Sequence, residues 1–205
     1  MKHQIRIIAG SVRGRWLYSP EGDTTRPMLG RVKNSLFNII SPHLEEAAVL
    51  DLFAGTGALG LEALSRGAKT CIFIEKDEQS FQLLQKNISR LGFDNQSEAC
   101  YFNAFDIIKF LQQKKFYLDI IFISPPYKFF DDTVMPPVDP PRRTPEKDKL
   151  LGIIDEFVKE NILSKNGLVI IEHQKRQLKD LSFKYLSRYK QRSYGDIILS
   201  FFSPA

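Results

Sequence analysis

Three glycines, Gly55, Gly57 and Gly60, form the first group of residues whose spacing has a chemical use. They follow a short apolar run and precede a helical pattern that starts near residue 58. Glycines at this spacing let the backbone of a strand–turn–helix unit come close to a bound nucleotide. On their own they would suggest a dinucleotide such as NAD.

Two carboxylates near the glycines favour a different ligand. Asp51 lies four residues before Gly55, where its charge would oppose a pyrophosphate but suits a ligand with an ammonium and a sulfonium group. Glu75 ends the next strand, where it can accept hydrogen bonds from both hydroxyls of a ribose. This combination resembles the S-adenosylmethionine site of class I methyltransferases. The alternative is a tight turn with a capping acid.

A second group, Ser124-Pro125-Pro126-Tyr127, ends the fourth strand, at the edge of the sheet where ligands bind in open α/β folds. The prolines fix the backbone, and Tyr127 offers a ring on which a planar base can stack. The run resembles the D/N-P-P-Y/F motif of methyltransferases that act on amines, with Ser124 in place of Asp or Asn. We predict that these four residues are catalytic and that Ser124→Asp raises the rate.

Several segments together resemble the RsmD family, which methylates the N2 amine of a guanine in 16S ribosomal RNA. The similarity spans about residues 5–202, and it is carried by residues 26–38, 51–68, 124–127 and 194–196. It implies S-adenosylmethionine as cofactor and 16S rRNA, within a 30S assembly particle, as partner. The chain departs from the family at Ser124, at residues 28–30 and in the proline-rich segment 131–147.

The resemblance implies a cofactor site at the ends of the first three strands. The residues that we assign to it are Asp51, Phe53, Gly55, Gly57, Glu75, Lys76, Ala104 and Phe105. The cofactor's methyl group is already electrophilic, so the enzyme mainly aligns and desolvates the reactants. Carbonyl oxygens of Pro125 and position 124 would orient the lone pair of the amine. This chemistry needs no metal, and we expect none.

These residues require a scaffold of alternating strands and helices. Apolar strands are expected at 48–50, 70–75, 98–103, 118–123 and 167–172, with helices at 58–66, 77–91, 104–113 and 148–163. Two antiparallel strands, 183–189 and 197–202, follow. We therefore expect an α/β, Rossmann-like class I methyltransferase fold. Its sheet has seven mostly parallel strands with an antiparallel C-terminal strand, and a small N-terminal β-hairpin is added.

The positive charge of the chain is concentrated at its N-terminus. Residues 1–42 are predicted as a basic hairpin and helix, and residues 43–205 as the methyltransferase domain. Of the net charge of +5, all lies in the first 40 residues, which indicates a polyanionic partner. The residues that we assign to RNA contact are Arg13, Arg15, Arg26 and Arg31. A second basic excess lies at 175–192.

Composition excludes several classes of protein. With 43% hydrophobic and 26% charged residues, the chain is a folded domain and not a disordered one. No apolar run reaches the roughly 18 residues that a membrane span needs, and we expect no secretory signal, because residues 1–6 lack its apolar region. Cys71 and Cys100 lie in separate strands, so free thiols are expected in place of a disulfide or a zinc site. We expect a cytoplasmic monomer.

Other functions remain open at this stage. The enzyme could methylate another amine, either adenine N6 in DNA or RNA or the amide of a protein glutamine. A noncatalytic RNA-binding assembly factor would keep cofactor binding without activity, an idea that only Ser124 supports. A nicotinamide oxidoreductase is opposed by Asp51 and by the Pro-Pro-Tyr loop.

Overall fold

The computed structural model describes residues 5–20, 28, 30–126, 145–175 and 181–205. Its strands are β1 (Ile5–Arg6), β2 (Trp16–Leu17), β3 (Ala48–Asp51), β4 (Thr70–Glu75), β5 (Ser97–Tyr101), β6 (Leu118–Ile123), β7 (Leu163–Gln174), β8 (Leu186–Tyr194) and β9 (Ile197–Pro204). Its helices are α1 (Gly30–Ile40), α2 (Gly60–Ser65), α3 (Glu78–Leu91), α4 (Ile107–Lys114) and α5 (Pro145–Lys159).

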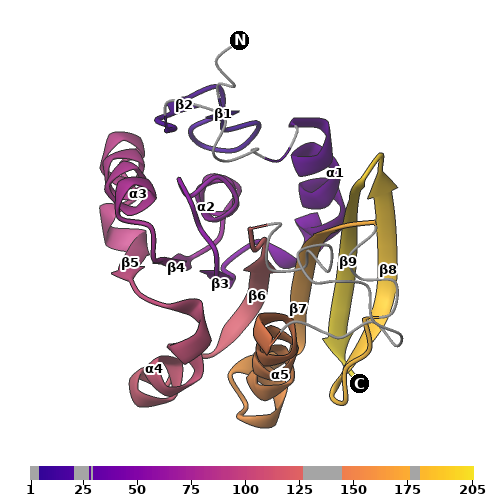
Figure 1. The fold of residues 1–205 in the computed structure, drawn as a ribbon. Coiled ribbons are helices and arrows are strands. Elements are labelled where there is room, and N and C mark those ends of the chain that lie inside the picture. The colour runs from indigo at the N-terminus through magenta and orange to yellow at the C-terminus, as the bar shows by residue number, and fades with distance from the viewer. Residues whose placement is uncertain (1–4, 21–27, 29, 127–144, 176–180) are drawn as a thin grey trace, which may run out of the picture.

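One seven-stranded sheet, in the order β5-β4-β3-β6-β7-β9-β8, runs through the molecule (Figure 1). The first five strands in that order are mutually parallel, and β9 runs antiparallel between β7 and β8. A separate antiparallel pair, β1 and β2, forms the N-terminal hairpin. The predicted sheet, its antiparallel C-terminal strand and the hairpin are therefore confirmed.

Helices cover both faces of the sheet, and each face has its own apolar core. Val49 and Phe122 belong to a core that also holds residues of α1, α2 and α3, whereas Leu50 and Ile121 belong to a second core with residues of α4 and α5. Phe37 of α1 packs on Phe122, with their ring centroids 5.8 Å apart. Strands that are buried on both sides explain the continuous apolar runs in the sequence.

The predicted helix 148–163 is wrong at its end. The helix stops at Lys159, and β7 already begins at Leu163. Asn161 has a left-handed backbone with φ of 54°, which a helix cannot accommodate. Ile162 and Leu163 are buried in the second core, so their apolar character was misread as a continuation of the helical face.

Two other predicted boundaries also change. The proline-rich segment 131–147 was expected to lie outside any helix, but α5 starts at Pro145, and proline is well tolerated in a first helical turn. The strand predicted at 183–189 is shifted to β8, and only Gly195 and Asp196 form the turn that leads to β9. Pairing of the strand ends across this turn sets the register.

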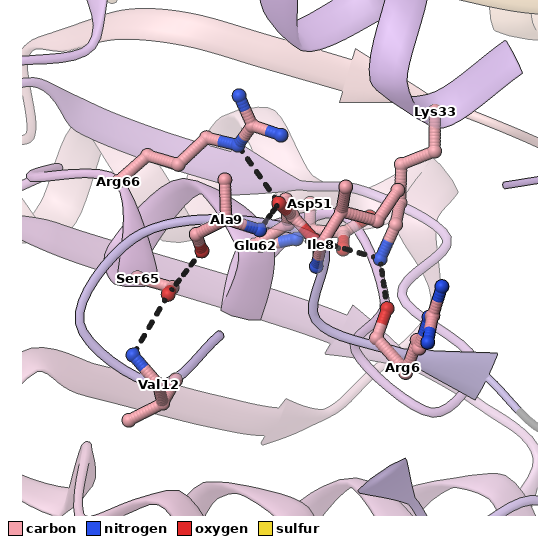
Figure 2. A network of polar contacts seen from close by, with 10 residues as sticks. Arg6, Ile8, Ala9, Val12, Lys33, Asp51, Glu62, Ser65 and Arg66 are labelled. Carbon is pink, nitrogen blue, oxygen red and sulfur yellow. Dashed lines mark hydrogen bonds and ion pairs between the residues drawn. The ribbon is translucent and has the colours of Figure 1, made fainter. Parts of the chain in front are cut away.

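A buried ion-pair network fixes the N-terminal segment to the helices (Figure 2). Glu62 of α2 is fully buried and binds Lys33 Nζ and Arg66 Nε, each at 2.8 Å. Its carboxylate oxygens also accept hydrogen bonds from the amides of Ile8 and Ala9, at 2.8 and 3.0 Å. Burial alone would raise the pKa of Glu62, but the charge of Lys33 and these hydrogen bonds hold it below its ordinary value.

A second contact closes the same segment over α2. Ser65 Oγ donates to the carbonyl of Ala9 at 2.6 Å and accepts from the amide of Val12 at 3.2 Å (Figure 2). Gly10 between them has a φ of +87°, and a Cβ atom there would lie 1.7 Å from the Ser65 carbonyl oxygen. Only glycine fits this approach.

The hairpin and α1 share a core with the sheet. Ile7, Leu17 and Phe37 all lie in the apolar cluster that includes Phe122. The domain boundary at residue 42 stays a prediction.

Cys71 and Cys100 are free thiols, as expected. No helix among the described residues is long and apolar enough to cross a membrane.

Candidate active site

A cavity of about 480 Å³ lies at the carboxyl ends of the parallel strands. That volume falls within the range of sites for small molecules. Of the residues that the sequence analysis assigned to the site, the cavity is lined by Asp51, Phe53, Gly55, Glu75, Lys76, Ala104, Phe105, Ser124, Pro125 and Pro126. Tyr127 lies outside the described residues. The structure therefore brings together residues from the ends of β3, β4, β5 and β6, whose individual roles stay predictions.

The three glycines have different surroundings. Gly55 is part of the cavity lining. Gly57 is not, and it has a φ of +85° with Leu84 Cδ1 only 2.6 Å from where a Cβ would stand. At Gly60 a Cβ would lie 2.2 Å from the ring of Phe73. Gly57 and Gly60 thus allow α2 to pack closely, and Gly55 presents backbone to the cavity.

Asp51 contacts the start of α2 and also lines the cavity. Its Oδ2 accepts a hydrogen bond from the amide of Gly60 at 3.0 Å. The side chain is buried, and burial, aided by the charge of Glu75, raises its pKa to about 7 against the opposing bond from Gly60. A cation bound in the cavity would favour the ionised form of this carboxyl.

Glu75 is oriented by the backbone around it. Its Oε2 accepts from the amide of Gly55 at 2.7 Å, and its Oε1 accepts from the amides of Lys76 and Asp77 at 2.8 and 2.7 Å. A carboxylate offers about four lone-pair sites, so three backbone donors leave room for a ligand hydroxyl. The side chain therefore joins the glycine turn to the end of β4 and still faces the cavity.

The part of the cavity at the end of β5 is apolar and aromatic. Ala104 is buried, and the Asn103 side chain accepts from the amide of Phe105 at 3.1 Å, which shapes the turn there. Lys149 Nζ of α5 lies 5.0 Å from the centroid of the Phe105 ring. Together with Phe53, this lining suits a planar heterocycle.

Glu172 is a cavity residue that the sequence analysis missed. It lies near the end of β7, is 7% exposed, and accepts a hydrogen bond from Ser124 Oγ. Burial raises its pKa, and the bond from Ser124 opposes that shift. The sequence did hold a signal, because an apolar strand followed by Glu172 repeats the pattern that led to Glu75.

The cavity lining does not include Arg13, Arg15 or Arg31, three of the four arginines assigned to RNA. Arg13 and Arg15 are exposed in the N-terminal hairpin, and Arg31 is exposed on the first turn of α1. Arg26 lies outside the described residues. Lys33, which was counted in the basic segment, is buried against Glu62, so its charge is compensated inside the protein.

No three His, Cys, Asp or Glu side chains in the described ranges are grouped so that they could hold a metal ion. The histidine nearest to the cavity in sequence, His173, is buried, and its Nε2 lies 3.0 Å from Ser200 Oγ. The polar side chains that line the cavity are carboxylates, the hydroxyls of Thr56, Ser80 and Ser124, two amides and the amine of Lys76.

Comparison with known proteins agrees with this geometry. A family model described as "Conserved hypothetical protein 95" matches residues 5–203. The "Putative rRNA methyltransferase YlbH" of Bacillus subtilis is 33% identical over 171 residues, which is 83% of each chain. The "Ribosomal RNA small subunit methyltransferase D" of Escherichia coli K12 is 44% identical over 125 residues, 61% of each chain, so the match spans less than two thirds of that relative.

Solved structures share the whole fold. "Putative methyltransferase yhhF from Escherichia coli" has a TM-score of 0.75 and 27% identity over 98% of both chains. A hypothetical protein of Thermus thermophilus has a TM-score of 0.72 and 26% identity over 96% of this chain and 98% of its own. The Rossmann-like methyltransferase fold is therefore confirmed. The chain belongs to the family described as "Conserved hypothetical protein 95", which is the RsmD family that its sequence resembles.

Proposed function

We propose that this protein is an S-adenosylmethionine-dependent methyltransferase that modifies the N2 amine of a guanine in 16S rRNA, within a 30S assembly particle. One observation carries the proposal: Asp51 and Glu75 share a single cavity with Ser124 and Pro125. The first pair suits the cofactor and the second pair suits an amine. The names of the relatives support ribosomal RNA as the substrate. Ribosomal subunits are assembled in the cytoplasm, so the proposal places the protein there.

The residues present fit this cofactor. The buried Asp51 carboxyl suits a cationic amino-acid portion, and Glu75, with one lone-pair site left by its three backbone donors, suits a ribose hydroxyl. The aromatic lining by Phe53 and Phe105 suits adenine. When bound, the cofactor supplies a methyl group on a positively charged sulfur, and that charge makes the methyl carbon strongly electrophilic.

The loop after β6 would orient the amine. Pro125 is buried and lacks an N–H, so its rigid backbone presents carbonyl oxygens as acceptors. The lone pair of a guanine amine is delocalised into the ring, which makes the nitrogen a weak nucleophile. Acceptors at Ser124 and Pro125 would hold the amine hydrogens and direct the lone pair towards the methyl group. Tyr127 would stack on the base, as its resemblance to the family motif implies.

Binding of RNA would use the exposed arginines of the N-terminal segment. Arg13, Arg15 and Arg31 present charge to solvent without an internal ion pair among the described residues. Contacts of this kind fall on phosphates and position the nucleic acid without reading its sequence. The monomeric state stays a prediction.

The experiment that tests the proposal is transfer of a tritiated methyl group to free 16S rRNA, to 30S particles and to DNA, followed by nucleoside analysis. Label in N2-methylguanine from 16S rRNA is expected. Label in N6-methyladenine, or in a protein glutamine, would show a different amine substrate. Cofactor binding without any transfer would support the assembly factor, and tight binding of NAD would contradict the cofactor assignment.

A further inference from the structure

The parallel pairing of β6 and β7 brings Ser124 and Glu172 together. Phe122 lies opposite Ile170 in this ladder, so the residues two positions further on, Ser124 and Glu172, share one face of the sheet. Both line the cavity, and Ser124 Oγ donates its hydrogen to Glu172 Oε2. Asp51 lies on the neighbouring strand, β3, on the same face and also lines the cavity.

The hydrogen bond leaves Ser124 with an oxygen that can accept. A hydroxyl has one hydrogen and two lone pairs, and the hydrogen is directed to Glu172. An acceptor whose own hydrogen is bound by a carboxylate is polarised towards greater negative charge. Bonds with an ionised partner are roughly twice as strong as neutral ones.

We propose that Glu172 is a positioning residue for methyl transfer that acts through Ser124. Ser124 Oγ accepts a hydrogen bond from the substrate amine, and Glu172 holds the Ser124 hydroxyl and supplies negative charge behind it. The pair thereby replaces the single Asp or Asn that the family motif has at position 124. This inference rests on the proposed function.

The same pair gives the amine proton a destination. As the amine nitrogen forms its bond to the methyl carbon, the carbon–sulfur bond breaks and its electron pair stays on sulfur. The nitrogen becomes positively charged, and one N–H proton must leave. That proton passes to Ser124 Oγ while the Ser124 hydroxyl proton passes to Glu172, and the N–H bonding pair returns to nitrogen. Glu172 ends as a neutral carboxylic acid, Ser124 is unchanged, and the product amine is neutral.

His173 does not offer an alternative acceptor for this proton. Its side chain lies on the other face of β7 from that of Glu172. His173 pairs with Ile198 of β9 in the strand ladder, and its Nε2 is hydrogen-bonded with Ser200 Oγ. Beside Glu172, β6 places Ser124 and β9 places the apolar Leu199. The other charged groups that line the cavity are Asp51, Glu75, Lys76 and Asp77.

The proposal predicts an acid limb in the pH dependence of transfer. Burial raises the pKa of Glu172, and once protonated it supplies no negative charge behind Ser124 and cannot take up the Ser124 proton. The rate should therefore fall as pH falls. Saturating cofactor is needed in this experiment, because Asp51 also titrates, with a pKa raised to about 7.

Single-turnover methyl transfer to the 16S rRNA substrate, between about pH 5 and pH 8, tests the inference with three variants. Glu172→Gln keeps the size of the side chain and its hydrogen-bond acceptor but removes the charge. It should slow transfer by about tenfold or more and flatten the acid limb. Adding Ser124→Asp to this variant should recover most of the rate. Ser124→Asp alone places two carboxyls together, so one is protonated, and the gain expected from the sequence should largely vanish.

A matched control and a readout independent of activity complete the design. Glu46→Gln removes an exposed carboxylate before β3, at the opposite end of that strand from the cavity, and should change neither rate nor pH profile. The pKa of Glu172, followed by carbon-13 NMR, should rise further in Ser124→Ala, because the lost bond lowers it in the native protein. This measurement tests the link between Ser124 and Glu172 even if Glu172→Gln does not fold.

The outcomes separate this inference from the proposed function. A Glu172→Gln variant with native rate and pH profile, or a loss that Ser124→Asp does not recover, would overturn the role of Glu172 and leave the methyltransferase intact. An unchanged Glu172 pKa in Ser124→Ala would also overturn it. A native protein that methylates no 16S rRNA guanine would overturn the proposed function and this inference with it.

Discussion

Buried acids occur in two regions of this molecule, and their partners differ. Glu62, in the network that holds the N-terminal segment, is paired with Lys33 and Arg66. Asp51 and Glu172, in the cavity, have no ion pair with a Lys or Arg anywhere in the described part of the chain. The pKa of Glu62 is held low by its partners, whereas burial raises those of Asp51 and Glu172.

This difference distinguishes a structural acid from a functional one. A buried carboxylate costs several kcal/mol in desolvation unless cations and donors compensate it, and Glu62 has both. At Asp51 much of that compensation is missing, which disfavours the free protein and favours a bound cation. Such a residue is a candidate for ligand binding, because a bound cation would compensate the desolvation cost of its carboxylate.

The largest expected effect comes from breaking the network. Lys33→Met removes one of the two cations paired with the buried Glu62 and should destabilise the fold by roughly 3–5 kcal/mol, measured by chemical denaturation. The matched control is Lys69→Met, because the pair of Lys69 with Glu46 is largely exposed and should be worth about 0–1 kcal/mol. Equal losses for the two variants would contradict the structural role of the network.

Asp51→Asn should have the opposite effect on the free energy of unfolding: it should stabilise the ligand-free protein. Because the folded state holds the Asp51 proton up to a pKa of about 7, this residue makes the fold less stable as pH rises from about 4 to 7. Asn keeps an acceptor for the Gly60 amide without a charge, so the variant should be more stable by about 2–4 kcal/mol at pH 8. Thermal denaturation across this pH window measures it, and a destabilised variant at pH 8 would show that Asp51 stabilises the fold.

Glu75→Ala should weaken S-adenosylmethionine binding by about 1.5–3 kcal/mol, because hydrogen bonds to a charged acceptor are lost. It also releases the amides of Gly55, Lys76 and Asp77, so part of the loss reflects a looser turn. Calorimetric titration measures the affinity. Unchanged affinity would exclude Glu75 from the cofactor site.

The smallest expected change is in the salt dependence of RNA binding. Exchange of Arg13, Arg15 and Arg31 for Gln should flatten the slope of log affinity against log salt by roughly 2, at about 0.7 for each contact to a single strand. Cofactor affinity should not change. The control exchanges Lys115, Lys159 and Lys165, which are exposed near the amino-terminal ends of β6 and β7. A native slope in the arginine variant would show that the hairpin does not bind phosphates.

Local patterns predicted what depends on neighbours in sequence. The strands and glycine turn followed from apolar runs and residue spacing, and the Gly55–Glu75 bond is consistent with the acid expected after β4. Glu172 was missed because its link to Ser124 depends on β6 and β7 lying side by side, 48 residues apart in the chain. The pairing of Lys33 was not predicted for the same reason, since its partner Glu62 lies on another helix.

The end of α5 shows a different limit. Ile162 and Leu163 fit an apolar helical face as well as they fit a strand, and the left-handed Asn161 lies in the short break between the two elements. A periodic pattern over a short apolar run does not identify such a boundary. This error does not change the predicted fold, because both elements contribute to the same core.

Proton release on cofactor binding shows whether the ionised carboxyl of Asp51 binds the cofactor. S-adenosylmethionine is titrated calorimetrically into the protein at about pH 6 in two buffers of different ionisation enthalpy. Below its pKa of about 7 Asp51 is mostly neutral, so a cationic ligand that needs its charge should release a proton, and Asp51→Asn should bind more weakly without that release. Binding with no proton release in the native protein, or equal affinity in Asp51→Asn, would show that the cofactor does not depend on an ionised Asp51.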